Sequence, residues 1–235
     1  MTAPMVFTLR ISLPDRPGTL GMVASAFGKG HVNILTLDVV DRADGMAVDD
    51  LRVEAPRGMQ EAIRRAGEAV PGFAVEYVRP LDAFGHVLEP LELAALLEDS
   101  GAEALGLLVE HLPDSMAASW AIVVEVPDPV GEAPRVLAAS LGAPSAGRLL
   151  PAWLEPPSET STGGGEPAWS VPAPEAGGLE VAAARLEAPA AVVLLGRERG
   201  PTFRASEVRH LGLLARIAGA AVARSGGLVP TASAP

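Results

Sequence analysis

One short segment near the start of the chain has the residue types that hold a small charged ligand. It reads Asp15-Arg16-Pro17-Gly18-Thr19-Leu20-Gly21. The segment follows an apolar run over residues 6–13 and precedes an apolar helix pattern. A strand that enters a helix through a Pro-Gly turn leaves backbone N–H groups free at the helix start, and such groups bind anions. The segment therefore predicts a site for a carboxylate or a similar anion.

The individual residues of this turn have separate roles in the predicted site. Pro17 fixes its own backbone and lacks an N–H, and Gly18 lets a ligand approach the main chain closely. We expect the next three N–H groups, from Thr19 to Gly21, to point at a bound carboxylate. The helix dipole adds a few tenths to about 1 kcal/mol to this binding. The carboxylate of Asp15 is suited to accept a hydrogen bond from an ammonium group.

A second polar residue, Asn33, follows the predicted helix in the segment His31-Val32-Asn33-Ile34. Its carboxamide both donates and accepts hydrogen bonds, so it suits either end of a zwitterion. A structural interpretation of the same residues stays open. In that interpretation Asp15 caps the helix or the turn, and Asn33 ties the turn to the next strand.

Hydrophobic periodicity predicts the elements that must position this turn. Strands are predicted over residues 6–13, 32–40, 46–55 and 73–78, and helices over 20–27 and 59–70. The alternation is imperfect at Asp49-Asp50, which indicates a bulge there and a solvated pair of carboxylates. The order strand, helix, strand, strand, helix, strand is the split βαβ repeat, a four-stranded antiparallel sheet with two helices on one face.

The turn, the segment Val32-Asn33-Ile34 and this element order resemble the ACT domain over about residues 5–80. The resemblance implies a small ligand, often an amino acid, bound between two sheets of different chains. It places these residues at the site: Asp15, Arg16, Pro17, Gly18, Thr19, Leu20, Asn33 and Ile34. One chain supplies the turn, and the partner supplies Asn33. Some members carry a polar residue where this chain has Leu13, which argues against a strongly polar ligand such as serine. Many ACT domains act only as dimerisation modules.

The rest of the chain predicts a linker over residues 81–90 and a second unit over 91–226. Helices are predicted from residue 91, over 103–112 and over 207–224, and strands over 121–126, 136–141, 179–186 and 190–195. Residues 142–178 are rich in proline and glycine, which predicts a long mobile loop. Trp153 and Trp169 within it are interpreted as anchors on the domain surface. Residues 227–235 are predicted to be a flexible tail.

The end of the second unit resembles a GAF domain. The resemblance rests on Ala191-Val192-Val193-Leu194-Leu195-Gly196-Arg197, on Gly200-Pro201-Thr202-Phe203, and on Glu207 with the long helix after it. It implies an α/β unit with an antiparallel sheet, which dimerises through its last helix or binds a small molecule in a cup. A serine or threonine usually caps that helix just after the phenylalanine. Arg204 stands there, so we expect the cap to come from elsewhere or the helix start to fray.

Composition excludes several classes of function. The 235-residue chain has a formal net charge of −11 and no basic stripe, which excludes nucleic acid and disfavours anionic membranes as partners. It contains no cysteine, which excludes disulfides, thiolate catalysis and zinc-thiolate sites. The first residues lack the pattern of a signal peptide and no apolar run is long enough to span a membrane, so a cytoplasmic protein is expected. Histidine spacing predicts no metal site, and no cofactor is expected.

The chain as a whole predicts a mixed α+β protein, with a ferredoxin-like βαββαβ ACT domain followed by a GAF-like domain. The leading hypothesis is a non-enzymatic regulatory homodimer that binds a small effector, an amino acid, at the ACT interface and relays its presence through the GAF-like domain. The alternative is a dimerisation or protein-interaction module with no ligand. A small acyl hydrolase is disfavoured, because no nucleophile and base are paired in the sequence.

Overall fold

The computed structural model describes residues 4–68, 70–80, 88, 90–125, 134–149, 151–154, 168–172, 178–198 and 201–226. The chain divides into two compact units, Met1–His86 and Val87–Pro235. Each unit contains one antiparallel sheet with helices packed against it, so the fold is mixed α+β, as predicted. Most of the predicted linker and the predicted tail over 227–235 lie outside the described residues.

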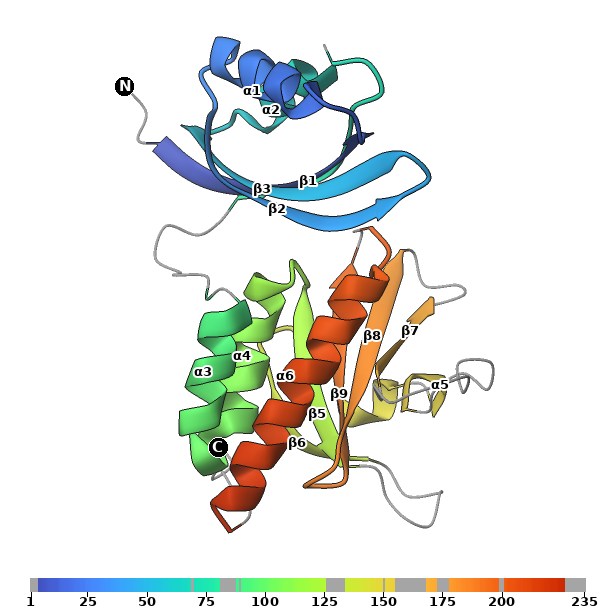
Figure 1. Ribbon diagram of the computed structural model, residues 1–235. Coiled ribbons are helices and arrows are strands. Elements are labelled where there is room, and N and C mark those ends of the chain that lie inside the picture. Colours follow the sequence, from blue (N-terminus) through green and yellow to red (C-terminus); the bar gives the residue numbers. More distant parts are fainter. Residues whose placement is uncertain are drawn as a thin grey trace. The chain divides into compact units, whose positions relative to one another are not determined.

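The first unit has the predicted βαββαβ order. Its elements are β1 (Pro4–Pro14), α1 (Thr19–Lys29), β2 (Asn33–Ala43), β3 (Met46–Pro56), α2 (Gln60–Glu68) and β4 (Ala74–Pro80). The sheet order is β2-β3-β1-β4, and both helices cover one face of it (Figure 1). This arrangement is the ferredoxin-like fold, with the first turn at the end of a central strand.

Strict alternation in β1 builds the core of this unit. Every second residue faces the helices and is buried: Phe7, Leu9, Ile11 and Leu13. From α1, Phe27 packs edge-on against Phe73, with ring centroids 6.2 Å apart at 84°. Each of these buried apolar side chains contributes about 1.5–3 kcal/mol of transfer free energy. The core thereby fixes where β1 ends and α1 begins.

The bulge expected at Asp49-Asp50 lies instead on the neighbouring strand. β3 pairs with β1 without interruption, from Pro4 opposite Pro56 to Pro14 opposite Met46. The register shifts occur where β2 pairs with β3, between Ile34 and Thr36 and between Val39 and Asp41 of β2. Asp49 therefore keeps the regular alternation of β3, on the same face as its partner Ile11.

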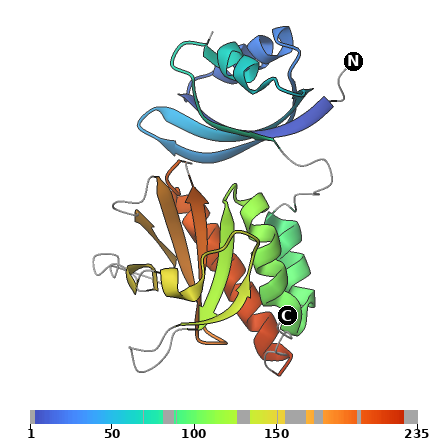
Figure 2. The same ribbon diagram turned by 180° about the vertical axis from the view of Figure 1, so that it is seen from behind.

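The second unit forms a five-stranded antiparallel sheet in the order β6-β5-β9-β8-β7. Its elements are α3 (Pro90–Asp99), η1 (Gly101–Glu103), α4 (Ala104–Ser115), β5 (Trp120–Glu125), β6 (Arg135–Ala139), η2 (Ala146–Arg148), α5 (Pro151–Leu154), β7 (Ala168–Pro172), β8 (Leu179–Leu186), β9 (Ala191–Glu198) and α6 (Ala205–Arg224). Helices α3, α4 and α6 cover one face, and the short α5 lies on the other (Figures 1 and 2). None of the described helices is long and apolar enough to cross a membrane.

The prediction of one long loop over residues 142–178 was wrong for part of that segment. It contains η2, α5 and the edge strand β7, whose Trp169 pairs with Ala183 of β8. Trp153 and Trp169 are buried core residues rather than surface anchors. They pack on the face of the sheet opposite the long helices, where the ring of Trp153 lies 6.3 Å from that of Trp120. Residues 155–167 and 173–177 of the expected loop lie outside the described residues.

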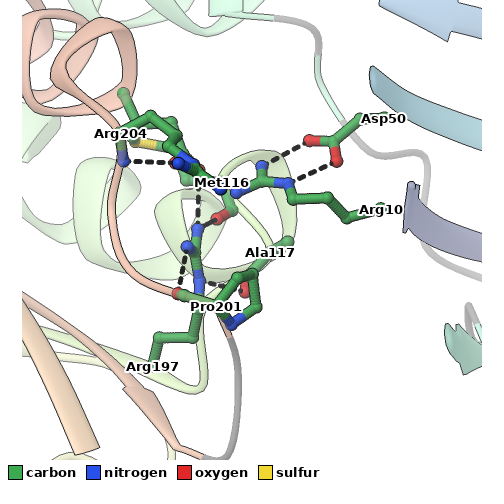
Figure 3. A network of polar contacts seen from close by, with 8 residues as sticks. Arg10, Asp50, Met116, Ala117, Arg197, Pro201 and Arg204 are labelled. Carbon is green, nitrogen blue, oxygen red and sulfur yellow. Dashed lines mark hydrogen bonds and ion pairs between the residues drawn. The ribbon is translucent and has the colours of Figure 1, made fainter. Parts of the chain in front are cut away.

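A buried arginine holds the start of α6 in place (Figure 3). Arg197 is 2% exposed, and its guanidinium donates to the carbonyl oxygens of Met116 at 2.7 Å, Pro201 at 2.9 Å and Ala117 at 3.1 Å. It also donates to Oε1 of Glu207 at 2.7 Å. One side chain thus joins the end of α4 to the loop before α6.

Glu207 supplies the cap that Arg204 could not supply by itself. Its second carboxylate oxygen, Oε2, accepts a hydrogen bond from the backbone N–H of Arg204 at 2.8 Å. A glutamate at this position of the first turn is the acidic half of a capping box. The helix begins at Ala205, and Glu207 satisfies the N–H of the residue before it, which is the part of the expected cap that comes from elsewhere.

Candidate ligand site at the first turn

The turn between β1 and α1 has a backbone geometry that requires glycine at its end. The N–H of Asp15 donates to the carbonyl oxygen of Gly45 at 2.9 Å, which ties the turn to the tip of the β2–β3 hairpin. Gly18 precedes the helix at φ 92° and ψ −14°, in the left-handed region that only glycine enters at little cost. No side chain caps the helix, so the structural interpretation of Asp15 as a cap of α1 was wrong.

Two backbone N–H groups, rather than three, are free at the start of α1. The N–H of Thr19 donates to the carbonyl oxygen of Arg16 at 3.2 Å, and Met22 makes the first helical bond, to Gly18, at 3.1 Å. Between them, the N–H groups of Leu20 and Gly21 have no acceptor in the described part of the chain. Adjacent free donors at the positive end of a helix form an anion site.

The exposed carboxylate of Asp15 has one weak cationic neighbour. Its Oδ2 lies 3.8 Å from Nε of Arg42, and the two side chains are 44% and 62% exposed. An exposed pair at this distance contributes 0–1 kcal/mol, so a ligand can displace it at little cost. Arg16, Pro17 and Gly18 are also exposed, so the turn is open to solvent.

Asn33 lies at the other end of the sheet from Asp15. Asn33 of β2 pairs with Glu54 of β3. Pro14 of β1, the neighbour of Asp15, pairs with Met46 at the opposite end of β3. The stretch of β3 between these two partners spans about 27 Å at about 3.4 Å per residue. One chain therefore does not bring Asp15 and Asn33 together. Ile34, the last residue of the predicted site, packs half-buried against the core of the unit.

The structure adds a carboxylate that sequence reasoning had assigned to the surface. Asp49 is 1% exposed and occupies a helix-facing position of β3, opposite Ile11. No described residue donates a hydrogen bond to its Oδ1. Burial raises the pKa of Asp49; Arg42 opposes this shift, and the charges of Asp15 and Asp50 add to it. Asp49, Arg42 and Asp15 therefore share one electrostatic environment beside the turn.

Asp50, the other half of the expected surface pair, is partnered. Its two oxygens accept from Nε and Nη2 of Arg10, both at 2.7 Å, on the opposite face of β3 (Figure 3). Every second residue of β3 faces the core, and counting back from Val53 and Leu51 places Asp49 on the same face. This period is the sequence signal that could have separated the two neighbouring aspartates.

A groove of about 750 Å³ begins beside the turn and continues between α1 and α2. Gly18 and Gly21 form its start, and Lys29 and Arg65 lie along it. Among the described residues, no three histidine or acidic side chains are grouped so as to hold a metal ion. The groups available at the turn are suited to charge interactions and hydrogen bonding: the free N–H groups of Leu20 and Gly21, the carboxylate of Asp15, and the guanidinium groups of Arg16 and Arg42.

No protein-family model and no curated protein sequence matches the chain. Solved structures that resemble it include the ACT domain of a GTP pyrophosphokinase from Chlorobium tepidum, at 20% identity and TM-score 0.26, covering 34% of this chain and 100% of that one. An ACT domain protein from Streptococcus pneumoniae matches at 11% identity and TM-score 0.27, over 32% of this chain and 89% of that one. An unknown protein from Galdieria sulphuraria matches at 13% identity and TM-score 0.31, over 83% and 80%. At these scores the likenesses identify no family, and the assignment of the fold rests on the strand order.

Proposed function

We propose that this protein is a non-enzymatic regulatory protein that binds an amino acid at the first turn. The observation that carries the proposal is the start of α1, where the N–H groups of Leu20 and Gly21 have no acceptor among the described residues, in the same turn as the exposed carboxylate of Asp15. The α-carboxylate of an amino acid can accept hydrogen bonds from the two N–H groups, and its ammonium group can donate to the carboxylate of Asp15. The resemblance of the turn to ACT domains supports the same assignment.

The proposed active form is a homodimer in which the turn of one copy meets Asn33 of the other. Within one chain these residues lie at opposite ends of the sheet, and both are exposed. A ligand that contacts both copies stabilises the dimer by mass action. In the proposal, the GAF-like second unit carries this change onward; the resemblance of its last strand and helix to GAF domains supports that role.

Binding of the twenty standard amino acids, measured by calorimetry on the full chain, tests the proposal. We expect at least one to bind in the millimolar range or tighter. Asp15→Ala and Asn33→Ala should each weaken that binding several-fold, because each removes a hydrogen-bonding group from the site. Asp38→Ala, which removes an exposed carboxylate elsewhere on β2, is the matched control and should leave binding unchanged.

The thermal midpoint of each variant should stay near that of the wild type, because Asp15, Asn33 and Asp38 are all exposed. If none of the twenty amino acids binds, amino-acid sensing is wrong and a dimerisation module without a ligand takes its place. Sedimentation velocity with and without the bound amino acid then tests the dimer directly. A monomer under both conditions would contradict the shared site.

A further inference from the structure

We propose that the second unit binds an extended, basic segment of a partner protein in a groove between α4 and the edge strand β6. The segment adds to β6 as a further strand, and its apolar side chains enter the groove. Its lysine or arginine side chains lie against two glutamates of the groove wall, Glu103 and Glu110. This site is separate from the amino-acid site of the proposed function and does not depend on it.

The first step is the groove itself, which has a volume of about 1000 Å³. One wall is formed by η1 and α4, and the other by the second half of β6 with the residues that follow it. Both walls line the same cavity, so one ligand can contact them together. The large apolar residues of the lining are Leu105, Leu107, Val109, Leu137 and Leu141. Leu141 is 98% exposed at the groove, and exposed apolar surface of this kind indicates an interaction site.

The second step is the free edge of β6. Among the described strands, β6 pairs with β5 alone and forms an outer edge of the sheet, beside α4 (Figure 1). The N–H of Ser140 donates to the carbonyl oxygen of Ala121 at 2.9 Å. Backbone groups alternate in direction along a strand, so the N–H and C=O of Ala139 point away from β5. In the described part of the chain they bond to no residue beyond the sheet. Such an edge is a template for a further strand.

The third step is the charge around the groove. Glu103 and Glu110 are both exposed and line the wall formed by η1 and α4. The described residues of the lining include no lysine or arginine, and no described basic side chain pairs with either glutamate. Carboxylates beside an apolar surface favour a ligand that brings cationic and apolar side chains together. Alternation of the two kinds along an extended segment does this, because successive side chains of a strand point to opposite faces.

The same charges disfavour a second copy of the chain as the occupant. The chain has a formal net charge of −11. A symmetric pairing of two β6 edges places two acidic grooves side by side, and like charges across an interface weaken it. Within β6, the one basic side chain is Arg135, which is already paired with Glu125 at 2.7 Å. A partner segment of opposite charge is therefore the occupant that fits the groove.

Gly106 offers a way to close the groove without disturbing the fold. It lies in the first turn of α4 and lines the groove, and a Cβ at this position would meet no atom within 4 Å. A leucine here extends into the open space and replaces a flexible residue of the helix. We expect Gly106→Leu to unfold at the same temperature as the wild type or higher. The same change at the exposed Gly28 of α1, where a Cβ also meets nothing, is the matched control.

The experiment is fluorescence anisotropy on the full chain with three labelled eight-residue peptides. One alternates valine and lysine, one serine and lysine, and one valine and glutamate. We expect the valine–lysine peptide to bind tightest. Gly106→Leu should weaken its binding by about tenfold or more and Gly28→Leu by less than about twofold, because only the first variant fills the groove. The double variant Glu103→Gln, Glu110→Gln should weaken it by about fivefold at low salt and by less at high salt.

Two N-methylated copies of the valine–lysine peptide test the added strand. One copy carries methyl groups on the lysine nitrogens and the other on the valine nitrogens, so each lacks every second N–H donor. In a strand these alternate donors point to the same side, so at least one copy should bind about tenfold more weakly than the parent peptide. If both copies bind as tightly as the parent, strand addition is wrong.

The remaining outcomes decide which occupant the groove takes. Equal binding of the valine–lysine peptide to G106L and the wild type would overturn the groove as the site, because the binding would then reflect net charge alone. No binding of this peptide to the wild type would also overturn the proposal. Sedimentation velocity of both proteins then identifies the alternative: a wild-type dimer that is lost in G106L assigns the groove to a second copy of the chain. A failure of amino-acid binding affects the proposed function alone and leaves these results unchanged.

Discussion

Among the described residues, each of the two units has one acidic side chain that is buried as a whole, Asp49 and Glu207, and the two differ in how completely they are partnered. In the second unit, Glu207 uses both oxygens, one toward the guanidinium of Arg197 and one toward the N–H of Arg204. In the first unit, Asp49 is more deeply buried, yet its Oδ1 accepts nothing from the described residues. The hydrogen bonding of the buried carboxylate is thus complete in the second unit and incomplete in the first.

The difference predicts that the same chemical change has opposite effects on stability at the two carboxylates. A buried ion pair whose hydrogen bonds are all made fixes the geometry around it, and removing one partner leaves a costly charge behind. A buried carboxylate oxygen that accepts no hydrogen bond destabilises the folded protein. We therefore expect neutralisation of Glu207 to lower the stability of the protein and neutralisation of Asp49 to raise it.

Removal of the guanidinium in the second unit should have the largest effect. Arg197→Met leaves Glu207 buried without its cation and deprives three carbonyl oxygens of their donor. We expect a loss of about 3–5 kcal/mol in the free energy of unfolding of this unit, measured by urea titration. Arg135→Met, which breaks the exposed pair with Glu125, is the control and should change the stability of the unit little. Equal losses in the two variants would contradict the role given to burial.

Neutralisation of Glu207, whose two carboxylate oxygens are both hydrogen-bonded, should have an intermediate effect on stability. Glu207→Gln keeps the size of the side chain but replaces one charged acceptor with an amide, so the bonds to Arg197 and to the N–H of Arg204 cannot both keep their strength. We expect a destabilisation of about 2 kcal/mol, because hydrogen bonds to charged groups contribute about 1.5–3 kcal/mol each. A stabilised E207Q would show that the two buried carboxylates do not differ in this way.

The same chemical change in the first unit should have the smallest effect and the opposite sign. Burial raises the pKa of Asp49 above 3.8, so the native state holds this proton more readily than the unfolded chain. The resulting stabilisation is present at low pH and is lost as pH rises through the native pKa. We expect Asp49→Asn to stabilise the protein at pH 7 by about 1 kcal/mol.

The pH dependence of this gain is a separate check on the same variant. The advantage of D49N over the wild type should be absent below about pH 4, grow as pH rises and then level off. Thermal unfolding of both proteins across this range measures it. A constant difference at all pH values would mean that the carboxylate of Asp49 titrates alike in the native and unfolded states.

The first unit could be predicted from sequence because its local signals agree with its fold. Alternation in β1, the Pro-Gly turn and the helical period of α1 all indicate the same structure, and all are found. In the second unit, β7 was missed because proline and glycine surround it and only five residues form the strand. Its order comes from pairing with β8 and from burial of Trp169, which are contacts distant in sequence.

The backbone of the candidate site could be predicted from the sequence, whereas the burial of the charged residues near it could not. Pro17 and Gly18 predict the turn, although the donation from Thr19 to Arg16 removes one of the three expected N–H groups. Asp49 was assigned to the surface because two adjacent aspartates are typical of a solvated segment. Which of the two faces the core depends on the register of β3 against β1, where a shift of one residue exchanges the faces.

The placement of Asn33 and Asp15 at opposite ends of one sheet affects how such a sensor would respond in a cell. A site that needs both residues is built from two copies of the chain. The number of complete sites therefore rises with the square of the free protein concentration when dimers are scarce. Apparent affinity for the ligand would then depend on how much of the protein the cell makes. Expression level would set the threshold of the response, and a twofold dimer would offer two equivalent sites, each completed by the other copy.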